Sequence, residues 1–277
     1  MSKTEKHHAL ITGASQGIGR ALAEECGRRG IHTVLTALPD SGLKEAAAHV
    51  SNRYGTENLY RETDLLLPES PLGLLDWIRE RGLSIHILIN NAGTSYFSTF
   101  DLSSMSENEK VIELNITALT RMCLLFLPEL KNREKSYLLN VASLAGFFPL
   151  PCKAVYAASK AYVLNFTRAL RRELKDSPVS ISALCPGGVY TNTATRQVIK
   201  SQGFFGSQSS HPPEYVAATA MMGMLSGRAV IVPGWLNRLF RFLTTTVPTP
   251  LLIPFLYRRY YDGTYFRGRA AETAVES

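Results

Sequence analysis

Cysteines, acidic residues near the C-terminus and long apolar runs are all scarce in this chain of 277 residues. The four cysteines show no Cys-x-x-Cys spacing and no nearby paired histidines. This argues against a metal site and a disulfide framework, and it favours reduced thiols in the cytosol. Segment 1–8 is polar and lacks a signal-peptide core, so we expect no secretory leader. No recognised nucleic-acid-binding module is present, so we expect no nucleic-acid partner.

The rest of the composition is that of a globular protein. Hydrophobic residues make up 45% of the chain and charged residues 19%, and the length suits one large α/β domain. Short apolar runs alternate with helical patterns, which predicts a parallel sheet covered by helices on both faces. The expected strands span 8–12, 33–36, 59–63, 85–90, 137–141, 180–185 and 229–232, and the expected helices begin near Gly17, Ser41, Pro68, Ser106, Ala154 and Pro213.

A glycine-rich turn, Thr12-Gly13-Ala14-Ser15-Gln16-Gly17-Ile18-Gly19, follows the first expected strand and opens a helix. This order forms the phosphate-binding corner of a Rossmann-type dinucleotide fold. Gly13 allows the tight turn, Gly17 lets the backbone approach a pyrophosphate, and Gly19 lets the helix pack closely on the strand. The N–H groups at the helix N-terminus would hold the phosphates. A purely structural turn is the alternative, because glycine triplets also occur by chance.

We therefore predict a doubly wound, seven-stranded parallel sheet within residues 1–234. Residues 235–277 would form a C-terminal amphipathic extension that is not an independent domain.

Tyr156 and Lys160 lie four residues apart in the run Tyr156-Ala157-Ala158-Ser159-Lys160. On a helix this spacing places the ammonium and the phenol on one face. A neighbouring cation favours the phenolate and lowers the pKa of the tyrosine toward neutrality, as a general acid or base requires. An exposed amphipathic pair is the alternative. Ser143, thirteen residues upstream, and the glycine turn favour the catalytic interpretation.

These segments together resemble the short-chain dehydrogenase/reductase family, from about residue 8 to about residue 232. Asn90-Asn91-Ala92-Gly93 matches the Asn-Asn-Ala-Gly motif of that family, and Asp64 stands where the family places an aspartate against the adenine ring. Segment 186–191 resembles the loop that caps the nicotinamide. The resemblance assigns the following residues to the cofactor: Gly13, Ser15, Gln16, Gly17, Ile18, Gly19, Asp64, Leu65, Asn91, Ala92, Gly93, Tyr156, Lys160, Pro186, Gly187, Val189 and Thr191.

Asn115, Ser143, Tyr156 and Lys160 fill the four catalytic positions of the family. The resemblance implies that Tyr156 donates a proton to a ketone as hydride arrives from the nicotinamide. Ser143 would hold the carbonyl oxygen by a hydrogen bond. Lys160 would lower the Tyr156 pKa and hold the nicotinamide ribose, and Asn115 would fix a water that relays protons to Lys160. A helix residue with a satisfied amide is the alternative for Asn115.

The end of the second expected strand decides between NAD and NADP in such folds. An acidic residue there would hold the ribose 2′-hydroxyl of NAD, and an arginine would pair with the 2′-phosphate of NADP. This chain has Ala37 and Leu38 at the tip, and Gln16 in the turn is also neutral. Asp40 would reach a ribose or, more simply, cap the helix after Ser41. The missing carboxylate favours NADP(H).

The expected substrate pocket is apolar. Its expected walls and lid favour a lipophilic carbonyl, such as a long-chain β-keto compound or a steroid-like ketone, and consist of Leu144, Phe147, Phe148, Leu150, Val189, Phe204 and Phe205. Packing of the core is the alternative for these residues. Segment 201–210 is rich in glycine and serine and is either a closing loop or plain surface chain. Cys152 either reaches the pocket or fills the core.

The C-terminal segment 235–261 interleaves large apolar residues with four arginines and has no acidic residue before position 262. Its prolines and short apolar runs exclude an ordinary transmembrane helix. This pattern suits a segment lying in a membrane interface, and the net charge of +7 favours an anionic surface. The alternatives are a cover over the pocket or sheet edge and a subunit interface.

The sequence thus predicts a cytoplasmic reductase, either free or at the inner face of a membrane, that reduces a lipophilic ketone with NADPH. The resemblance implies a homodimer or homotetramer through the long helices that begin near Ser106 and Ala154. An NAD-dependent alcohol dehydrogenase of hydroxysteroid type is the first alternative. A non-catalytic nicotinamide sensor or scaffold is the second alternative, and the presence of all four catalytic residues argues against it.

Overall fold

The structure, a computed structural model, describes residues 6–190, 210–247, 250–251 and 254. Its centre is a sheet of seven parallel strands in the order β3-β2-β1-β4-β5-β6-β7. The strands are β1 (His7–Thr12), β2 (His32–Ala37), β3 (Asn58–Glu62), β4 (Ser84–Asn90), β5 (Ser136–Val141), β6 (Val179–Leu184) and β7 (Val230–Ile231). The predicted α/β fold class and seven-stranded parallel sheet are confirmed.

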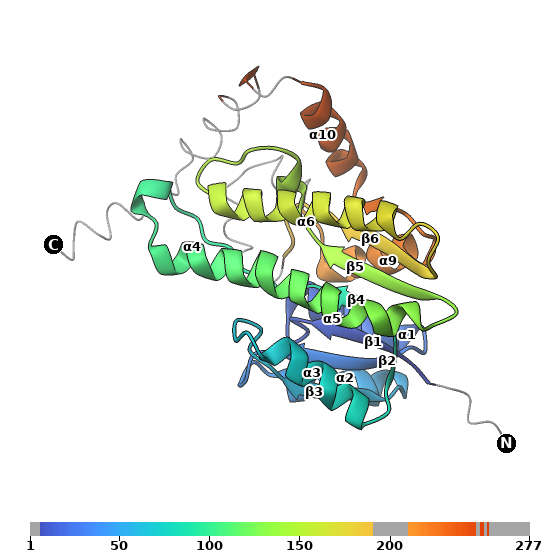
Figure 1. The fold of residues 1–277 in the computed structure, drawn as a ribbon. Coiled ribbons are helices and arrows are strands. Elements are labelled where there is room, and N and C mark those ends of the chain that lie inside the picture. The colour runs from blue at the N-terminus through green and yellow to red at the C-terminus, as the bar shows by residue number, and fades with distance from the viewer. Residues whose placement is uncertain (1–5, 191–209, 248–249, 252–253, 255–277) are drawn as a thin grey trace.

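Helices cover both faces of the sheet (Figure 1). They are α1 (Gly17–Arg28), α2 (Leu43–Tyr54), α3 (Ser70–Glu80), α4 (Met105–Ile112), α5 (Leu119–Lys131), α6 (Ala154–Glu173), α9 (Pro213–Leu225) and α10 (Trp235–Thr246). A π-helical turn, Glu113–Ala118, joins α4 to α5, and short 3-10 turns span Phe100–Leu102 and Leu144–Phe147. The six helix starts expected from sequence each lie within two residues of a helix start in the structure.

Two apolar cores lie on opposite faces of the sheet. Helices α1, α2 and α9 cover the first core, and α3, α5 and α6 cover the second. The central strands are buried on both faces, which is why they read as continuous apolar runs such as Ala9-Leu10-Ile11.

One continuous helix among the described residues, Met105–Lys131, is long and apolar enough to cross a membrane by length and composition. Its Met122, Phe126 and Leu130 side chains are buried in the second core against the sheet. These three side chains are therefore used in packing, and other apolar residues of the helix, such as Leu124, are exposed.

Asp40 does not cap α2 as expected. Helix α2 begins at Leu43, and its N-cap is Gly42, whose φ of 77° is left-handed. Asp40 itself has a φ of 55°. These two left-handed residues turn the chain before the helix starts, so the helix begins two residues later than the capping argument requires.

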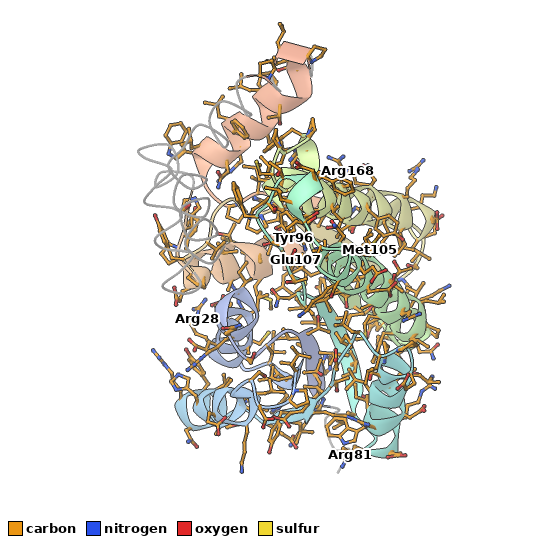
Figure 2. The ribbon with its side chains drawn as sticks, turned by 90° about the vertical axis from the view of Figure 1, so that its left-hand side faces the viewer. Arg28, Arg81, Tyr96, Met105, Glu107 and Arg168 are labelled. Carbon is orange, nitrogen blue, oxygen red and sulfur yellow. The ribbon has the colours of Figure 1, made fainter. Side chains whose placement is uncertain are left out.

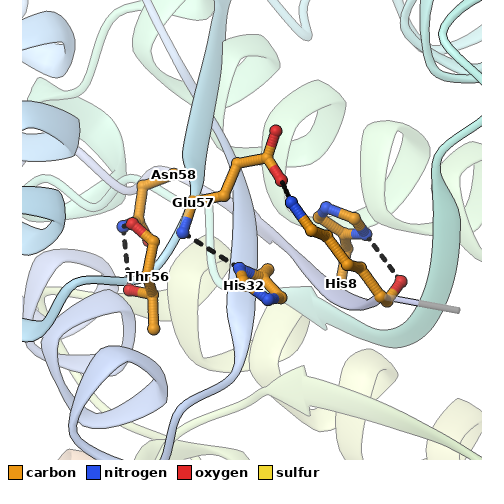
Figure 3. Close-up of polar contacts among 6 residues, drawn as sticks. His8, His32, Thr56, Glu57 and Asn58 are labelled. Atoms are coloured by element: carbon orange, nitrogen blue, oxygen red, sulfur yellow. Dashed lines mark hydrogen bonds and ion pairs between the residues drawn. The ribbon is translucent and has the colours of Figure 1, made fainter. Parts of the chain in front are cut away.

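Histidines gather at the amino edge of the sheet, where β1 and β2 begin (Figure 3). The rings of His8 and His32 lie 5.6 Å apart, and His32 Nδ1 accepts a hydrogen bond of 2.9 Å from the Glu57 N–H. The Glu57 carboxylate also forms a 2.7 Å ion pair with Lys6. This cluster lies at the opposite strand ends from the glycine turn, so we assign it to stability.

Candidate active site

Four chain segments leave adjacent strands at the carboxyl edge of the sheet. The glycine turn follows β1, Asn91 follows β4, Ser143 comes two residues after β5, and Pro186 comes two residues after β6. The strand order reverses between β1 and β4. Doubly wound sheets bind ligands at such a reversal, beyond the carboxyl ends of the strands.

The glycine turn has the backbone that its sequence predicts. Gly13 and Gly17 have φ values of 65° and 56°, in the left-handed region that favours glycine. A Cβ on Gly13 would lie 3.0 Å from Ala92 Cα, and a Cβ on Gly19 would lie 2.6 Å from Asn91 Nδ2 and clash with Gly13 O. The turn can therefore pack against β4 only with glycine at these positions.

Thr12 and Asn91 hold this turn in place. The Thr12 hydroxyl accepts hydrogen bonds from the N–H groups of Asn91, at 3.0 Å, and of Ala92, at 2.9 Å. In return Asn91 Nδ2 donates to the carbonyl oxygens of Thr12, at 2.9 Å, and Gly13, at 3.1 Å. The Asn91 side chain, expected at the cofactor, thus shapes the turn. The sequence analysis did not assign Thr12 a role, although its hydroxyl directly before the first glycine was a usable signal.

Helix α1 presents its N-terminus to this edge. Its N-cap, Gln16, is exposed and makes no capping hydrogen bond with its side chain. The first-turn N–H groups are therefore not occupied by a side-chain cap, which suits a phosphate. Ser15 is half-buried beside them, and Ile18 packs partly against the first core.

Tyr156 and Ser143 form a hydrogen-bonded pair. Tyr156 lies in the first turn of α6, and its half-buried phenol is hydrogen-bonded to the Ser143 side chain. The Ser143 Oγ also accepts the Ala145 N–H at 3.1 Å, which fixes the rotamer of the serine. Two hydroxyl groups are thereby positioned to hold one carbonyl oxygen.

The expected lowering of the Tyr156 pKa by Lys160 is not what the structure shows. Burial raises the pKa of Tyr156 above its ordinary value, and the hydrogen bond with Ser143 only partly offsets this. Lys160 Nζ lies 5.9 Å from the centre of the phenol ring. The expectation was wrong because i, i+4 spacing gives proximity and says nothing about how much water the phenol loses.

The ammonium of Lys160 is buried and engaged with the backbone. Only 5% of the residue is exposed, and Nζ donates a 2.9 Å hydrogen bond to Val141 O at the end of β5. Burial lowers the pKa of Lys160 to about 8. Gly93 makes room for this group, because a Cβ there would lie 3.3 Å from Nζ.

Asn115 lies in the π-helical turn and is fully buried. Its Oδ1 accepts the Thr94 N–H at 2.9 Å, and its Nδ2 donates to Thr94 O and to Ser159 Oγ, both at 3.0 Å. The amide is therefore satisfied within the protein, as the structural alternative for Asn115 required. A π-turn inside an α-helix is typical of functional sites. Here it places Asn115 against the Thr94 backbone and beside Gly93.

The comparisons with known proteins agree with this geometry. Residues 7–202 match the short chain dehydrogenase family. The chain belongs to the short-chain dehydrogenase/reductase family. Over 256 residues it is 32% identical to the very-long-chain 3-oxoacyl-CoA reductase of Anas platyrhynchos, a match covering 88% of this chain and 78% of that protein. It is 34% identical to the 17-beta-hydroxysteroid dehydrogenase type 3 of Mus musculus, across 66% of this chain and 60% of that protein.

Among solved structures, the chain is similar to the short-chain dehydrogenase from Sphingobium yanoikuyae in complex with NADPH. The TM-score is 0.74 and the identity 28%, over 87% of this chain and 96% of that one. The chain is therefore an NAD(P)-dependent oxidoreductase of this family.

The remaining residues expected at the cofactor lie after β3 and after β6, and some of them lie outside the described residues. Asp64 forms a local turn, with Oδ1 accepting the Leu66 N–H at 3.0 Å, and the Leu65 side chain is buried in the core. After β6, Pro186 O accepts the Leu144 N–H at 2.8 Å, and Val189 pairs with His211. Gly187 lies between them in the described chain. Thr191 and the expected lid residues, Phe204 and Phe205, lie outside the described residues.

The tip of β2 carries neither charge that would select a dinucleotide. Ala37 is buried, and its carbonyl accepts the Thr63 N–H at 2.7 Å. Leu38 follows with half of its surface exposed.

The expected pocket walls behave differently from one another. Leu144, Leu150 and Val189 are buried and pack within the core, as the alternative for them held. Phe147 and Phe148 are partly buried against the second core and also contact α10. The Phe148 and Phe240 rings lie 5.3 Å apart, edge to face, and the Arg241 guanidinium carbon lies 5.2 Å from the centre of the Phe147 ring. The start of the C-terminal extension therefore packs beside the active site. Cys152 is buried, and burial raises the pKa of its thiol.

Within the described part of the chain, no group of three or more His, Cys, Asp or Glu side chains could hold a metal ion.

Proposed function

We propose that this oxidoreductase reduces a lipophilic ketone with NADPH. The observation that carries the proposal is the Tyr156–Ser143 hydroxyl pair, set at the carboxyl edge of the sheet beside buried Lys160. The residues present fit a dinucleotide, because the turn needs glycine at Gly13 and Gly19 and the α1 N-terminus lacks a side-chain cap. When bound, the nicotinamide cofactor supplies the hydride.

The protein residues handle the proton and the developing charge. Burial keeps Tyr156 a phenol at neutral pH, which is the form that donates a proton to a carbonyl oxygen. Ser143 Oγ donates a second hydrogen bond to the same oxygen, where negative charge develops in the transition state. Lys160 holds positive charge nearby.

The cofactor preference rests on the tip of β2. A carboxylate there would repel the 2′-phosphate of NADPH, and Ala37 and Leu38 provide none. Solved relatives include complexes with NADPH and with NAD. An NAD-dependent alcohol dehydrogenase is therefore the alternative that the cofactor measurement must separate.

The substrate class rests on the relatives and on the apolar surroundings. The two curated relatives are named for 3-oxoacyl-CoA and hydroxysteroid substrates, and both compounds carry a carbonyl or alcohol on a large apolar body. Phe147 and Phe148 present partly buried rings between the Ser143 turn and α10. A lipophilic ketone would bury its apolar body against such rings.

The experiment is a titration of the purified protein with NADPH and, separately, with NADH, followed by nicotinamide fluorescence. We expect tighter binding of NADPH. Tighter binding of NADH would replace the proposal with the alcohol dehydrogenase. Binding of neither would remove the dinucleotide site and favour a scaffold role.

We also propose that α10 lies on an anionic membrane surface. One face of the helix is buried at Asn237 and Thr244 and partly buried at Phe240. Another stripe exposes Trp235, Leu239, Phe242 and Leu243, with no acidic residue anywhere in the helix. An exposed apolar stripe on a basic helix is typical of interfacial segments.

Liposome pelleting tests this second proposal with single-site changes. We expect Trp235→Ser and Phe242→Ser each to reduce pelleting with anionic vesicles. Leu124→Ser removes an equally exposed apolar side chain on α5 and is the matched control. Equal pelleting of all variants would refute the membrane role.

A further inference from the structure

A second lysine lies beside the catalytic phenol. Lys153 precedes α6, and its Nζ is 5.4 Å from the centre of the Tyr156 ring and 5.8 Å from the centre of the Phe97 ring. The side chain is half-buried between these rings. Such distances allow cation–π attraction to both rings. Nothing in the sequence spacing of Lys153 distinguishes it from a surface lysine, so the sequence alone does not identify it.

No carboxylate among the described residues balances this charge. Burial alone acts on the pKa of Lys153 and lowers it. Lys160 differs, because its ammonium already donates to Val141 O. A cation that loses water without gaining an acceptor is unfavourable. The donors of Lys153 are therefore available to a ligand that binds at the phenol.

The backbone directly before Lys153 is strained. Cys152 has a φ of 62°, which is left-handed and strained for a residue other than glycine. Its carbonyl oxygen accepts the Ser98 N–H at 3.0 Å, and this bond joins the start of α6 to the chain segment that carries Phe97. The strained backbone at Cys152 bends the chain, and this bend directs Lys153 toward the two rings.

The segment that carries Phe97 is fixed on both sides. The Thr94 backbone is bound to Asn115, and the Tyr96 hydroxyl donates to Asn108 Oδ1 on α4. Figure 2 labels Tyr96 and, in the first turn of that helix, Glu107. Ser98 is held by Cys152 on the other side. Lys153 and the two rings therefore form a site that exists before a substrate binds.

We propose that Lys153 is a specificity-determining residue that donates a hydrogen bond to a second oxygen of the substrate, carried by the carbon β to the reacting ketone. The reacting oxygen would sit on Tyr156, so an acceptor reached by Lys153 must be only a few bonds away. A 3-oxo ester, thioester or acid has such an oxygen. A rigid steroid-like ketone, whose next polar group lies at the far end of the ring system, does not. This inference rests on the proposed ketone reduction.

The test compares two substrates of equal length: a medium-chain 3-oxo ester and the monoketone with a methylene in place of the ester carbonyl. For Lys153→Met we expect kcat/KM to fall about tenfold to a hundredfold on the 3-oxo ester, as for loss of a charged hydrogen bond. On the monoketone we expect little change. Lys153→Arg should recover part of the loss. A 3-oxo acid then shows whether a carboxylate is preferred to the neutral ester.

Lys135→Met is the matched control, because Lys135 also lies over an aromatic ring, with Nζ 5.7 Å from the centre of Tyr137, at the amino end of β5. It should leave both substrates unaffected. Equal losses on both substrates in Lys153→Met, or no loss on either, would refute the role of Lys153 while ketone reduction stands. If the unaltered protein reduces neither substrate but binds the nicotinamide cofactor, both the inference and the proposed reduction fail.

Discussion

Thr12→Val should loosen the glycine turn and weaken dinucleotide binding. Thr12 is buried at the end of β1, and its hydroxyl accepts the N–H groups of Asn91 and Ala92. Valine has nearly the same shape and no acceptor. The substitution therefore leaves two backbone donors unpaired without creating a large cavity.

The expected cost follows from those two donors. An unsatisfied buried donor costs about 1–3 kcal/mol. Asn91 and Ala92 are half-buried, so water can partly replace the hydroxyl and the low end applies to each. We expect the free energy of unfolding to fall by about 2 kcal/mol.

Thr36→Val is a closely matched control. Thr36 pairs with Thr12 in the β1–β2 register and is fully buried, but its hydroxyl has no hydrogen-bond partner among the described residues. Removing a buried, unpaired hydroxyl relieves a desolvation cost of about 1–3 kcal/mol. We therefore expect Thr36→Val to leave stability unchanged or raise it.

Urea unfolding and nicotinamide fluorescence titration together provide the assay. Thr12→Val should lower the unfolding free energy and weaken binding of the dinucleotide, and Thr36→Val should do neither. Equal effects of the two substitutions would refute the claim that the Thr12 hydroxyl organises the cofactor turn.

Three further predictions test other parts of the structure. Gly93→Ala would place a Cβ 3.0 Å from Asn115 Oδ1 and 3.3 Å from Lys160 Nζ, so we expect steady-state kcat to fall about tenfold to a hundredfold. Leu38→Arg would supply a guanidinium for the ribose 2′-phosphate, and fluorescence titration should show NADPH binding about tenfold tighter with NADH little changed. Burial and nearby His32 lower the pKa of His8 below 6.5. The unfolded chain therefore binds a proton that the folded chain does not as pH falls below about 6.5, and stability should drop there.

Each of these has an outcome that contradicts it. Gly93→Ala with unchanged kcat would show that Asn115 and Lys160 can shift around the added methyl group without loss of activity. If Leu38→Arg tightened binding of NADPH and NADH equally, the ribose 2′-phosphate would not lie at the tip of β2. For His8, urea unfolding at pH 7.5 and 5.5 should show a smaller loss in His8→Gln than in the unaltered chain. Parallel losses would assign the pH dependence to other groups.

Much of the fold could be predicted because its signals are local. Alternating apolar runs and helical patterns identify the strands and the parallel sheet. The site residues could be grouped because each follows a strand whose carboxyl end lies at one edge. The family match then supported the oxidoreductase activity. The domain boundary near residue 234, the cytosolic location and the oligomeric state stay predictions.

Sequence alone says less where contacts between distant segments decide the outcome. The structure directs Asn91 toward Thr12, which its position in the motif did not reveal. The Tyr156 pKa rises because tertiary packing buries the phenol. Lys153 gains its place from a strained bend at Cys152 and from Phe97, more than fifty residues away in the sequence. None of these contacts has a signature within one helix or strand.

Single-turnover reduction measured for the unaltered protein and for Tyr156→Phe tests the central claim most directly. Each protein is loaded with NADPH and mixed with a lipophilic 3-oxo ester, and the loss of nicotinamide fluorescence is followed. We expect Tyr156→Phe to bind NADPH with unchanged affinity and to lose nearly all of its reduction rate, because phenylalanine keeps the ring and removes the proton donor. Retention of substantial turnover by Tyr156→Phe would show that another group supplies the proton.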